Sequence, residues 1–322
     1  MKKYNSYLIR LLFIFLLIWG CDAPHSNPLD PLNKKSELLV ISGYVYTFSL
    51  PRIPIQNAYI IWAPENKAFV SNSNGYFKIN VERPVSGWLK VHHANFKTDS
   101  LYVDFNNKKL VYEFYLNQIP IVDSLELYTI LLNQYPNLQT ASLATRIKIN
   151  DRDNDIDSVF IENSKDGKVY SLFYNTQTKF FERSFSEYDL DVEDLDELVG
   201  VKFRYVVKDL SKMKFVVAED KINRIIKSEI SLEYPVNYDT ISNRPLLVWR
   251  RISPGFKHNY SVEILSSDFP PVVVWFKHNL DMESSSVQTD IPLQPGTYYW
   301  VVWCIDQFLN RARSKPATFV VK

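Results

Sequence analysis

The sequence predicts an all-β protein made of three consecutive antiparallel β-sandwich domains, preceded by a short apolar segment and a tether. Three observations support this prediction. Apolar and polar residues alternate in short runs from residue 37 onward, as in strands that bury one face. Turn-forming residues separate these runs, and amphipathic helical patterns are nearly absent. The chain has 322 residues, of which 46% are hydrophobic and 15% aromatic, so it can bury several cores.

The amino-terminal segment has the pattern of an export signal. A basic start, an apolar run and a small residue follow one another: Lys2, Lys3 and Arg10, then residues 11–19, then Gly20. The apolar run is too short for a membrane-spanning helix. Residues 1–20 are therefore predicted to be a signal peptide. Two kinds of signal peptide are possible here: a lipoprotein signal, and an ordinary signal peptide in which the cysteine receives no lipid.

The end of this segment has a more specific pattern. Residues 18–21, Ile-Trp-Gly-Cys, resemble the lipobox of bacterial lipoproteins, in which a small residue precedes the cysteine that receives the lipid. The resemblance implies cleavage after Gly20 and a lipid on Cys21, so that a membrane is a partner of the chain through that lipid. It implies a lipid-anchored protein of the cell envelope. The outer membrane (periplasmic face or cell surface) is favoured, and the inner membrane is the alternative, because Asp22 after the cysteine resembles an inner-membrane retention signal.

The charge and cysteine content narrow the possible partners. Lys plus Arg is 37 against 36 for Asp plus Glu, so the chain lacks the basic excess of a nucleic-acid-binding protein. Nucleic acid is thus excluded as an expected partner. The chain has two cysteines, and if Cys21 carries a lipid then Cys304 has no partner for a disulfide. Residues 21–36 contain several prolines without apolar periodicity, which predicts an extended tether.

The first sandwich is predicted over residues 37–119. Its strand-like runs are residues 39–46, 58–62, 76–81, 87–92 and 110–116. Gly75 suits a turn that needs a positive φ, and Phe77 is expected in the core. Three segments are similar to the carboxypeptidase regulatory-like family: residues 42–45, 53–60 and 71–77. The resemblance implies a transthyretin-like sandwich that serves as a module without catalytic activity.

The second sandwich is predicted over residues 120–226. Runs such as residues 142–149 and 201–207 alternate apolar and basic side chains, which is typical of an antiparallel sandwich. An immunoglobulin-like domain is the expected fold. Residues 187–198 carry seven carboxylates, with three leucines expected on one side of a short helix. A solvated connection is the expected role of this segment, and a docking site for a basic partner is the alternative.

One acidic loop of this domain is a candidate calcium site. Carboxylates alternate along the loop and a glutamate follows: Asp151, Asp153, Asp155, Asp157 and Glu162. Calcium takes six to eight oxygen ligands, which such a loop can largely supply. However, Ile156 stands where an EF-hand loop needs glycine, and the next residues read as a strand. The loop also resembles a hairpin turn of bacterial immunoglobulin-like domains, so a plain turn is the favoured alternative.

The third sandwich is predicted over residues 227–322. Residues 245–249, 260–264 and 293–302 closely resemble a fibronectin type III domain, with a strand ending in Trp, a Tyr-x-Val-x-Ile strand and a Leu-x-Pro-Gly-Thr segment. The resemblance implies a tyrosine corner, in which a tyrosine hydroxyl bonds to upstream backbone. Either Tyr298 or Tyr299 can fill this position, because the spacing is one residue shorter than usual.

No pattern in the sequence predicts a catalytic residue. The five histidines do not cluster with cysteine or aspartate at the spacing of metal ligands, and no nucleophile elbow, phosphate loop or dinucleotide fingerprint occurs. Cys304 lies in an apolar strand and is predicted to be a buried, inert thiol. Apart from possible calcium, no cofactor is expected. Paired carboxylates that converge only in space stay an alternative.

The third sandwich has more aromatic residues than a core needs. Residues 298–305 and 272–276 are apolar on both faces of their strands, whereas a sandwich strand buries only one face. Trp275, Tyr299 and Trp303 are therefore the candidate binding residues. Packing against the second sandwich is the favoured explanation, and contact with a glycan or an envelope protein is the alternative.

Two hypotheses for function follow. The first is a non-catalytic, lipid-anchored binding or spacer protein of the cell envelope, which serves in adhesion, glycan capture or the assembly of a surface complex. The second is an accessory subunit of an envelope enzyme, or a hydrolase whose site forms at a domain junction. The resemblances to non-catalytic modules favour the first hypothesis.

Overall fold

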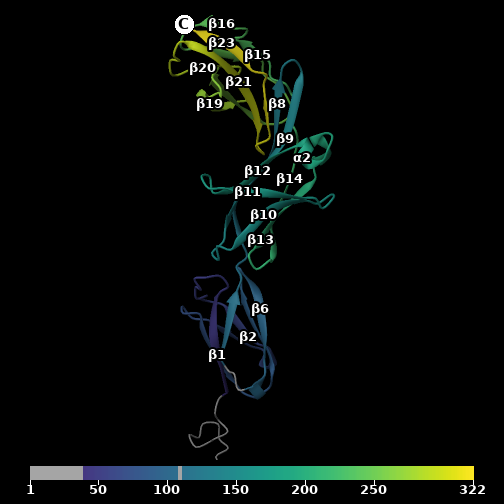
Figure 1. The fold of residues 1–322 in the computed structure, drawn as a ribbon, viewed down its shortest axis with the longest axis vertical. Helices are drawn as coiled ribbons and strands as arrows, with labels where there is room; N and C mark the ends of the chain where they lie inside the picture. The colour runs from purple at the N-terminus through teal and green to yellow at the C-terminus, as the bar shows by residue number, and fades with distance from the viewer. Residues whose placement is uncertain (1–38, 108–110) are drawn as a thin grey trace, which may run out of the picture. The chain divides into compact units, whose positions relative to one another are not determined.

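The computed structural model describes residues 39–107 and 111–322 (Figure 1). The predicted signal peptide, Cys21 and the tether lie outside the described residues. The described part contains twenty-three strands and only short helices, so the prediction of an all-β protein is confirmed. It divides into two compact units, the first ending at Gln118 and the second running from Ile119 to Lys322. No helix within the described ranges is long and apolar enough to cross a membrane.

The first unit consists of two sheets that enclose one core. Its strands are β1 (Leu39–Thr47), β2 (Tyr59–Trp62), β3 (Lys67–Val70), β4 (Tyr76–Val81), β5 (Gly87–His93), β6 (Phe96–Val103) and β7 (Val111–Leu116). The order is β4-β1-β7 in one sheet and β3-β2-β5-β6 in the other. Alternate residues of the strands point inward, and the largest fully buried side chains include Trp62, Phe77 and Phe114.

Two local predictions for this unit are confirmed. Gly75 has a φ of +72°, and a Cβ at this position would lie 2.4 Å from the carbonyl oxygen of Val45. Glycine thus provides both the positive φ and the close approach of two backbones. Phe77 is 2% exposed and stacks obliquely on Phe114, with ring centroids 6.2 Å apart.

The second unit begins with a sandwich of seven strands. These are β8 (Ile121–Gln134), β9 (Leu138–Asn150), β10 (Ile156–Asn163), β11 (Val169–Asn175), β12 (Phe180–Ser186), β13 (Lys202–Asp209) and β14 (Lys214–Lys221). Apolar residues from β8, β9, β10 and β13 form its core. Within this core the hydroxyls of Thr145 and Tyr205 lie 2.6 Å apart, and burial raises the pKa of Tyr205.

The acidic segment between β12 and β13 forms two short helices. These are α2 (Glu187–Leu190) and a 3₁₀ helix, η4 (Leu195–Leu198). The Ser186 side chain caps α2 in a capping box, as predicted. The three leucines of the segment are buried, but they lie on two helices and not on one side of a single helix. Three of its carboxylates pair with lysines: Asp191 with Lys168 at 2.6 Å, and Asp194 and Asp196 with Lys227. The segment is therefore attached to its own sandwich through both its apolar and its charged sides.

The third sandwich completes the second unit. Its strands are β15 (Leu232–Tyr234), β16 (Asp239–Ile241), β17 (Leu246–Trp249), β18 (His258–Ser266), β19 (Val273–Asp281), β20 (Ser286–Gln288), β21 (Gly296–Asp306), β22 (Arg311–Arg313) and β23 (Ala317–Val321). Trp249 and Trp300 are fully buried in its core. The Tyr298 hydroxyl donates a hydrogen bond to the Gln294 carbonyl at 2.9 Å, so Tyr298 forms the tyrosine corner.

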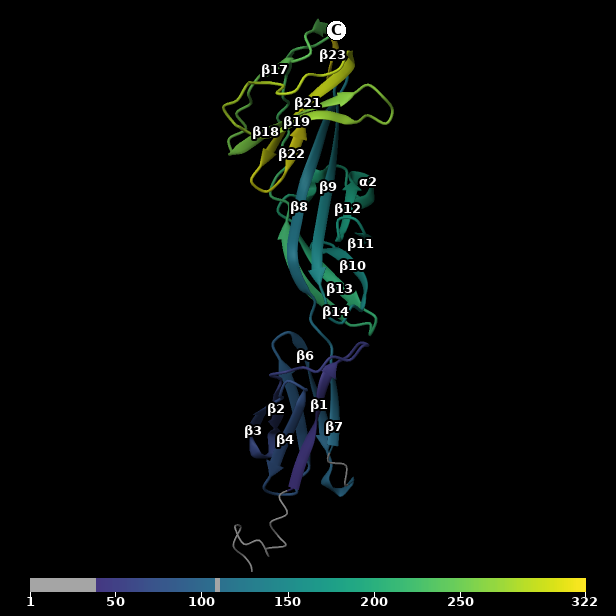
Figure 2. The same cartoon turned by 90° about the vertical axis from the view of Figure 1, so that its left-hand side faces the viewer.

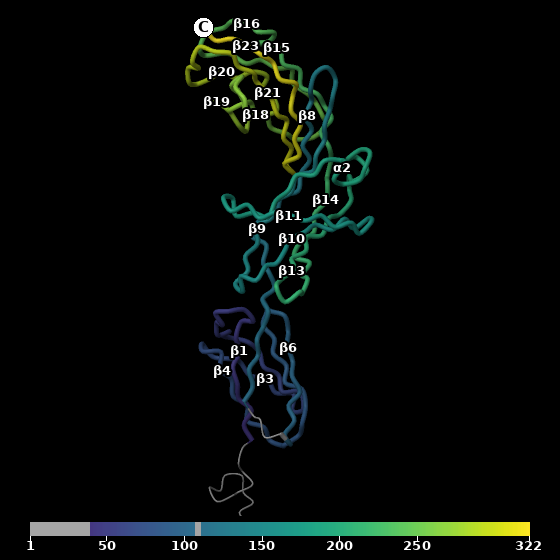
Figure 3. Tube along the Cα trace, in the orientation of Figure 1, coloured from purple at the N-terminus to yellow at the C-terminus, as the bar shows by residue number. Residues whose placement is uncertain are grey.

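A single sheet runs through the second and third sandwiches. Strand β22 pairs in parallel with β8, so that Arg311 lies beside Ile130 and Arg313 beside Leu132. Figure 2 shows β8 and β9 continuing from the second sandwich alongside β22, and Figure 3 traces the same hairpin. Leu131 of β8 is 2% exposed and belongs to the core of the third sandwich. The two sandwiches therefore form one compact unit, and their predicted boundary at residue 226 stays a prediction.

Three strand pairings are parallel, which refines the prediction of purely antiparallel sandwiches. They are β1 with β7, β8 with β22, and β16 with β23. Between the other named strands of the described ranges, pairing is antiparallel. Parallel neighbours here come from segments distant in sequence, which a local hydrophobic pattern does not reveal.

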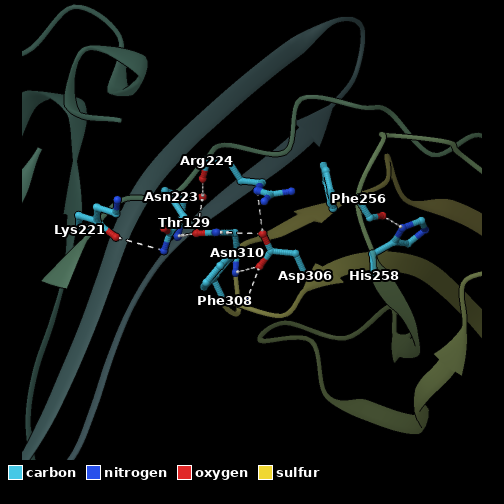
Figure 4. Close-up of polar contacts among 9 residues, drawn as sticks. All are labelled: Thr129, Lys221, Asn223, Arg224, Phe256, His258, Asp306, Phe308 and Asn310. Carbon is cyan, nitrogen blue, oxygen red and sulfur yellow. Dashed lines mark hydrogen bonds and ion pairs between the residues drawn. The ribbon is translucent and has the colours of Figure 1, made fainter. Parts of the chain in front are cut away.

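A network of buried polar groups connects the second and third sandwiches (Figure 4). The Asn310 side-chain oxygen accepts a hydrogen bond from the Thr129 amide at 2.9 Å, and its side-chain nitrogen donates to Asp306 at 3.1 Å. Asp306 in turn forms an ion pair with Arg224 at 3.4 Å. The Arg224 guanidinium lies over the Phe256 ring, 4.2 Å from its centroid. Since every partner here is held by another, the joint between the two sandwiches is expected to be rigid.

Candidate functional site

The candidate site is the outward face of β21 and its neighbours in the third sandwich, which we call the β21 face. Tyr299 and Trp303 are both partly exposed on this face. Val301 lies between them and is only 1% exposed, because surrounding side chains cover it. The strand thus carries apolar side chains on the side away from the core, as the sequence predicted, and Tyr299 and Trp303 are the partly exposed ones among these three.

Trp275 does not belong to this surface, which corrects the prediction that it binds a ligand. It is 4% exposed and lies in the core, and its indole nitrogen donates a hydrogen bond to Asp290 at 2.7 Å. Both faces of β19 are apolar, so alternation could not show which face turns inward. The exposed aromatic residue of this strand is Phe276, which is 58% exposed and stacks on His278 with ring centroids 4.7 Å apart.

A carboxylate fixes the orientation of Trp303. Its indole nitrogen donates a hydrogen bond to the Glu263 carboxylate at 3.1 Å. In the sheet, Glu263 lies between Phe276 of β19 and Val301 of β21. The Trp303 ring is therefore held by a bond at its edge while part of the side chain stays accessible.

A half-buried guanidinium lies next to Trp303 on the neighbouring strand. Arg313 is the register partner of Trp303, and its guanidinium lies 5.9 Å from the Trp303 ring centroid. Within the described ranges Arg313 forms no ion pair, and its Nε is buried without a hydrogen-bond partner. Burial lowers the pKa of Arg313, although Tyr299 and Glu263 act in the opposite direction.

The second sandwich holds the strand that carries Arg313. The Asn133 side-chain nitrogen of β8 donates a hydrogen bond to the Arg313 carbonyl at 2.8 Å. On the next outward position of β22, Arg311 lies over the Tyr128 ring, 4.4 Å from its centroid. The second sandwich thus packs against the third at the edge of its sheet, and it positions two arginines on the β21 face.

The β21 face combines the three kinds of group that recognise an acidic sugar. Aromatic side chains offer apolar surface to the C–H side of a sugar ring. A guanidinium matches a carboxylate with two parallel hydrogen bonds, and the bond is stronger because both groups are charged. A carboxylate such as Glu263 accepts hydrogen bonds from hydroxyls. Sequence patterns indicated Tyr299 and Trp303 but not Arg313 or Glu263, because their places depend on the register of β18, β21 and β22.

Comparisons with known proteins identify no family for the chain. No family model and no curated protein matches the sequence. Among solved structures, the chain is similar to fibronectin(III)-like modules of CbhA from Clostridium thermocellum, with 11% identity, a TM-score of 0.30, and 63% of this chain and 93% of that chain covered. It is also similar to the FN1–FN3 domains of chicken CNTN1, with 8% identity, a TM-score of 0.32, and coverages of 89% and 91%. A third likeness is to a putative carbohydrate binding protein from Bacteroides uniformis, with 10% identity, a TM-score of 0.21, and coverages of 56% and 98%.

The five carboxylates of the predicted calcium loop do not converge on one point. Asp157 forms an ion pair with Lys208 at 2.7 Å, and Glu162 forms one with Arg204 at 2.6 Å. Asp151 instead accepts hydrogen bonds from the amides of Asp153 and Asp155, which is the geometry of an Asx turn. Within residues 39–107 and 111–322, no group of three or more His, Cys, Asp or Glu residues is placed to hold a metal ion. Calcium binding by this loop therefore stays a prediction, with the plain turn as its alternative.

Cys304 has the environment of an inert thiol. It is fully buried in the core of the third sandwich and forms no disulfide. Burial raises its pKa to about 12, so the thiolate form is scarce at neutral pH. A nucleophilic role for Cys304 is not supported.

Proposed function

We propose that this protein is a non-catalytic, lipid-anchored protein of the cell envelope that captures an acidic glycan on the β21 face. The observation that carries the proposal is the position of Arg313. A half-buried guanidinium without an ion-pair partner in the described part of the chain lies beside the aromatic side chains Trp303 and Tyr299. A carboxylate of a ligand would supply the missing partner.

The amino-terminal sequence supports the envelope location. The basic start, the short apolar run and the Gly20-Cys21 junction resemble a lipoprotein signal, and the proline-rich residues 22–35 provide a tether. Fourteen residues of extended chain reach roughly 40 Å. The first unit also resembles the carboxypeptidase regulatory-like family and the third sandwich a fibronectin type III domain, both of which are non-catalytic modules.

Cys21 is expected to be the site of lipid attachment. In a bacterial host grown with an alkyne-labelled fatty acid, the wild-type protein should carry the label and Cys21→Ser should carry none. Cys304→Ser is the matched control, because it removes the other cysteine without touching the junction. Wild-type protein that stays unlabelled and unprocessed would show that residues 1–20 are not a lipoprotein signal.

Substitutions on the β21 face are expected to reduce glycan binding. A panel of uronic-acid and sialic-acid oligosaccharides is titrated calorimetrically against the full-length protein, with their neutral methyl esters as matched ligands. Trp303→Ala and Arg313→Ala should each weaken binding by about 30-fold, corresponding to about 2 kcal/mol for a central interface residue. The methyl esters should bind weakly to the wild-type protein, because the charge pairing with Arg313 is lost.

Two controls separate this role from a general loss of surface groups. Arg250→Ala removes an exposed arginine that pairs with Glu233 at 3.1 Å in another sheet of the same sandwich, and Tyr188→Ala removes a tyrosine that is 93% exposed. Neither should change the affinity. If the acidic oligosaccharides do not bind, or if they bind Arg313→Ala as tightly as the wild type, the β21 face has another role.

A further inference from the structure

The first unit carries a row of four tyrosines on a sheet face that points away from its core. Tyr44 and Tyr46 occupy alternate outward positions of β1, whose inward neighbours Gly43 and Val45 are buried. The antiparallel strand β4 places Tyr76 beside Tyr44, and the parallel strand β7 places Tyr115 beside Tyr46. Figure 2 shows β1 between these two strands. The four side chains therefore cross three strands as one row.

The rings of this row are in contact with one another. The centroids of Tyr76 and Tyr44 lie 5.3 Å apart, those of Tyr44 and Tyr46 lie 5.8 Å apart, and those of Tyr46 and Tyr115 lie 6.3 Å apart. The last two pairs are nearly parallel, with interplanar angles of 14° and 22°. All four side chains stay partly exposed. Outward positions of a two-layer sandwich are usually polar and solvated, so this aromatic row exceeds what the fold requires.

Charged groups fix one end of the row. The Arg52 guanidinium lies over the Tyr115 ring, 3.8 Å from its centroid, and the Tyr115 hydroxyl donates a hydrogen bond to Glu113. This hydrogen bond raises the pKa of Tyr115, which keeps its hydroxyl protonated. The cation and the anion next to the row thus lie together at its Tyr115 end, where they act on Tyr115 in opposite directions. The rest of the row, formed by Tyr76, Tyr44 and Tyr46, offers neutral rings and hydroxyls.

The size and chemistry of the row favour a small neutral ligand over a protein partner. Four partly exposed tyrosines offer on the order of 300 Å² of accessible side-chain surface. A stable protein interface needs about 800 Å² on each partner. Tyrosine is rigid and amphipathic, so it loses little conformational freedom when it binds. A linear chain of sugar units matches a row of rings and hydroxyls, because each unit has an apolar C–H side and polar hydroxyls.

We propose that the row Tyr76–Tyr44–Tyr46–Tyr115 is a second binding site, which takes a linear neutral polysaccharide. The rings contact the apolar side of successive sugar units, and the hydroxyls exchange hydrogen bonds with the sugar hydroxyls. This site lies in a different compact unit from the β21 face and takes a ligand without charge.

Affinity electrophoresis of the full-length protein in gels containing xylan, mannan or mixed-linkage β-glucan tests this site. The wild-type protein should be retarded by at least one of these polymers. Tyr44→Ala/Tyr46→Ala should bind that polymer at least tenfold more weakly, because it removes the centre of the row. Tyr44→Phe/Tyr46→Phe keeps the rings and should lose less affinity, so it preserves the test if the alanine variant does not fold.

Two control variants distinguish this site from the β21 face and from aromatic exposure in general. Tyr102→Ala removes a tyrosine that is 54% exposed on the other sheet of the same unit, and it should bind like the wild type. Arg313→Ala should also retain binding to the neutral polymer. Absence of wild-type retardation by all three polymers, an equal loss in Tyr102→Ala, or full binding by both double variants would overturn the inference. Binding of acidic oligosaccharides that depends on Arg313 is a separate result and bears only on the β21 face.

Discussion

Replacing Asp306 by alanine is expected to destabilise the second unit by about 3 kcal/mol, because it leaves a buried network without its central acceptor. The Asp306 side chain is 1% exposed. One carboxylate oxygen accepts hydrogen bonds from the amides of Phe308 at 2.8 Å and Asn310 at 3.0 Å. The other accepts from the Asn310 side chain and pairs with Arg224. Alanine removes all of these acceptors while the donors stay in place (Figure 4).

The loss is expected to weaken the joint between the two sandwiches more than either core. Asn310 also accepts a hydrogen bond from the Thr129 amide of β8, so a shift of Asn310 loosens the pairing of β8 with β22. Amide hydrogen exchange should therefore accelerate at Thr129 before it accelerates in the core strands. Since Arg313 lies on β22, the same substitution should also weaken the proposed glycan binding on the β21 face.

Urea unfolding of the full-length protein measures this effect through tryptophan fluorescence. Glu233→Ala is the matched control, since it removes one partner of an exposed ion pair in the same sandwich. The control should cost well under 1 kcal/mol, as is usual for an exposed pair. Asp306→Asn keeps a hydrogen-bond acceptor but loses the charge. Its loss of unfolding free energy should lie between those of Asp306→Ala and Glu233→Ala. If the free energy of unfolding falls no more in Asp306→Ala than in Glu233→Ala, the buried network adds little to stability.

Local features could be predicted where a backbone geometry, such as a positive φ, or a position at the start of a helix requires a particular type of residue. Gly75 was recognisable because its turn needs a positive φ, and it has one. Ser186 preceded a leucine pattern, and it caps α2. The family resemblance left the tyrosine corner open between two neighbours, and the hydrogen bond to Gln294 assigns it to Tyr298.

Features that depend on distant strands could not be predicted. The parallel pairing of β8 with β22 joins residues about 180 positions apart, and no local pattern encodes that register. The positions of Arg313 beside Trp303 and of Tyr115 beside Tyr46 follow from register in the same way. The prediction for Trp275 was wrong for a different reason. Its strand is apolar on both faces, so the alternation of apolar and polar residues does not show which face points inward. The sequence therefore indicated which residue types could form a site. Which of these residues lie next to one another became known only from the fold.

Gly43→Ala is expected to destabilise the first unit by about 3 kcal/mol, at the upper end of what overpacking costs. Gly43 lies in the middle of β1, between Phe77 of β4 and Tyr112 of β7. A Cβ at this position would lie 1.9 Å from the Tyr112 carbonyl oxygen and 2.8 Å from the Phe77 ring. The carbonyl belongs to the backbone of the neighbouring strand, so relief requires the two strands to separate. This clash gives a physical reason for glycine in the segment that resembles the carboxypeptidase regulatory-like family.

Unfolding of the full-length protein should show this loss in the first unit alone. The chain divides into two compact units after Gln118, so the transition of the second unit is expected to keep its midpoint in Gly43→Ala. Gly296→Ala is the matched control, because a Cβ there would meet its nearest neighbour, the Tyr298 ring, at an ordinary 3.6 Å. It should change the free energy of unfolding of each unit by no more than about 0.5 kcal/mol relative to the wild type. A Gly43→Ala protein that lowers both midpoints together would show that the two units unfold as one, and the clash at β1 would then destabilise the whole chain.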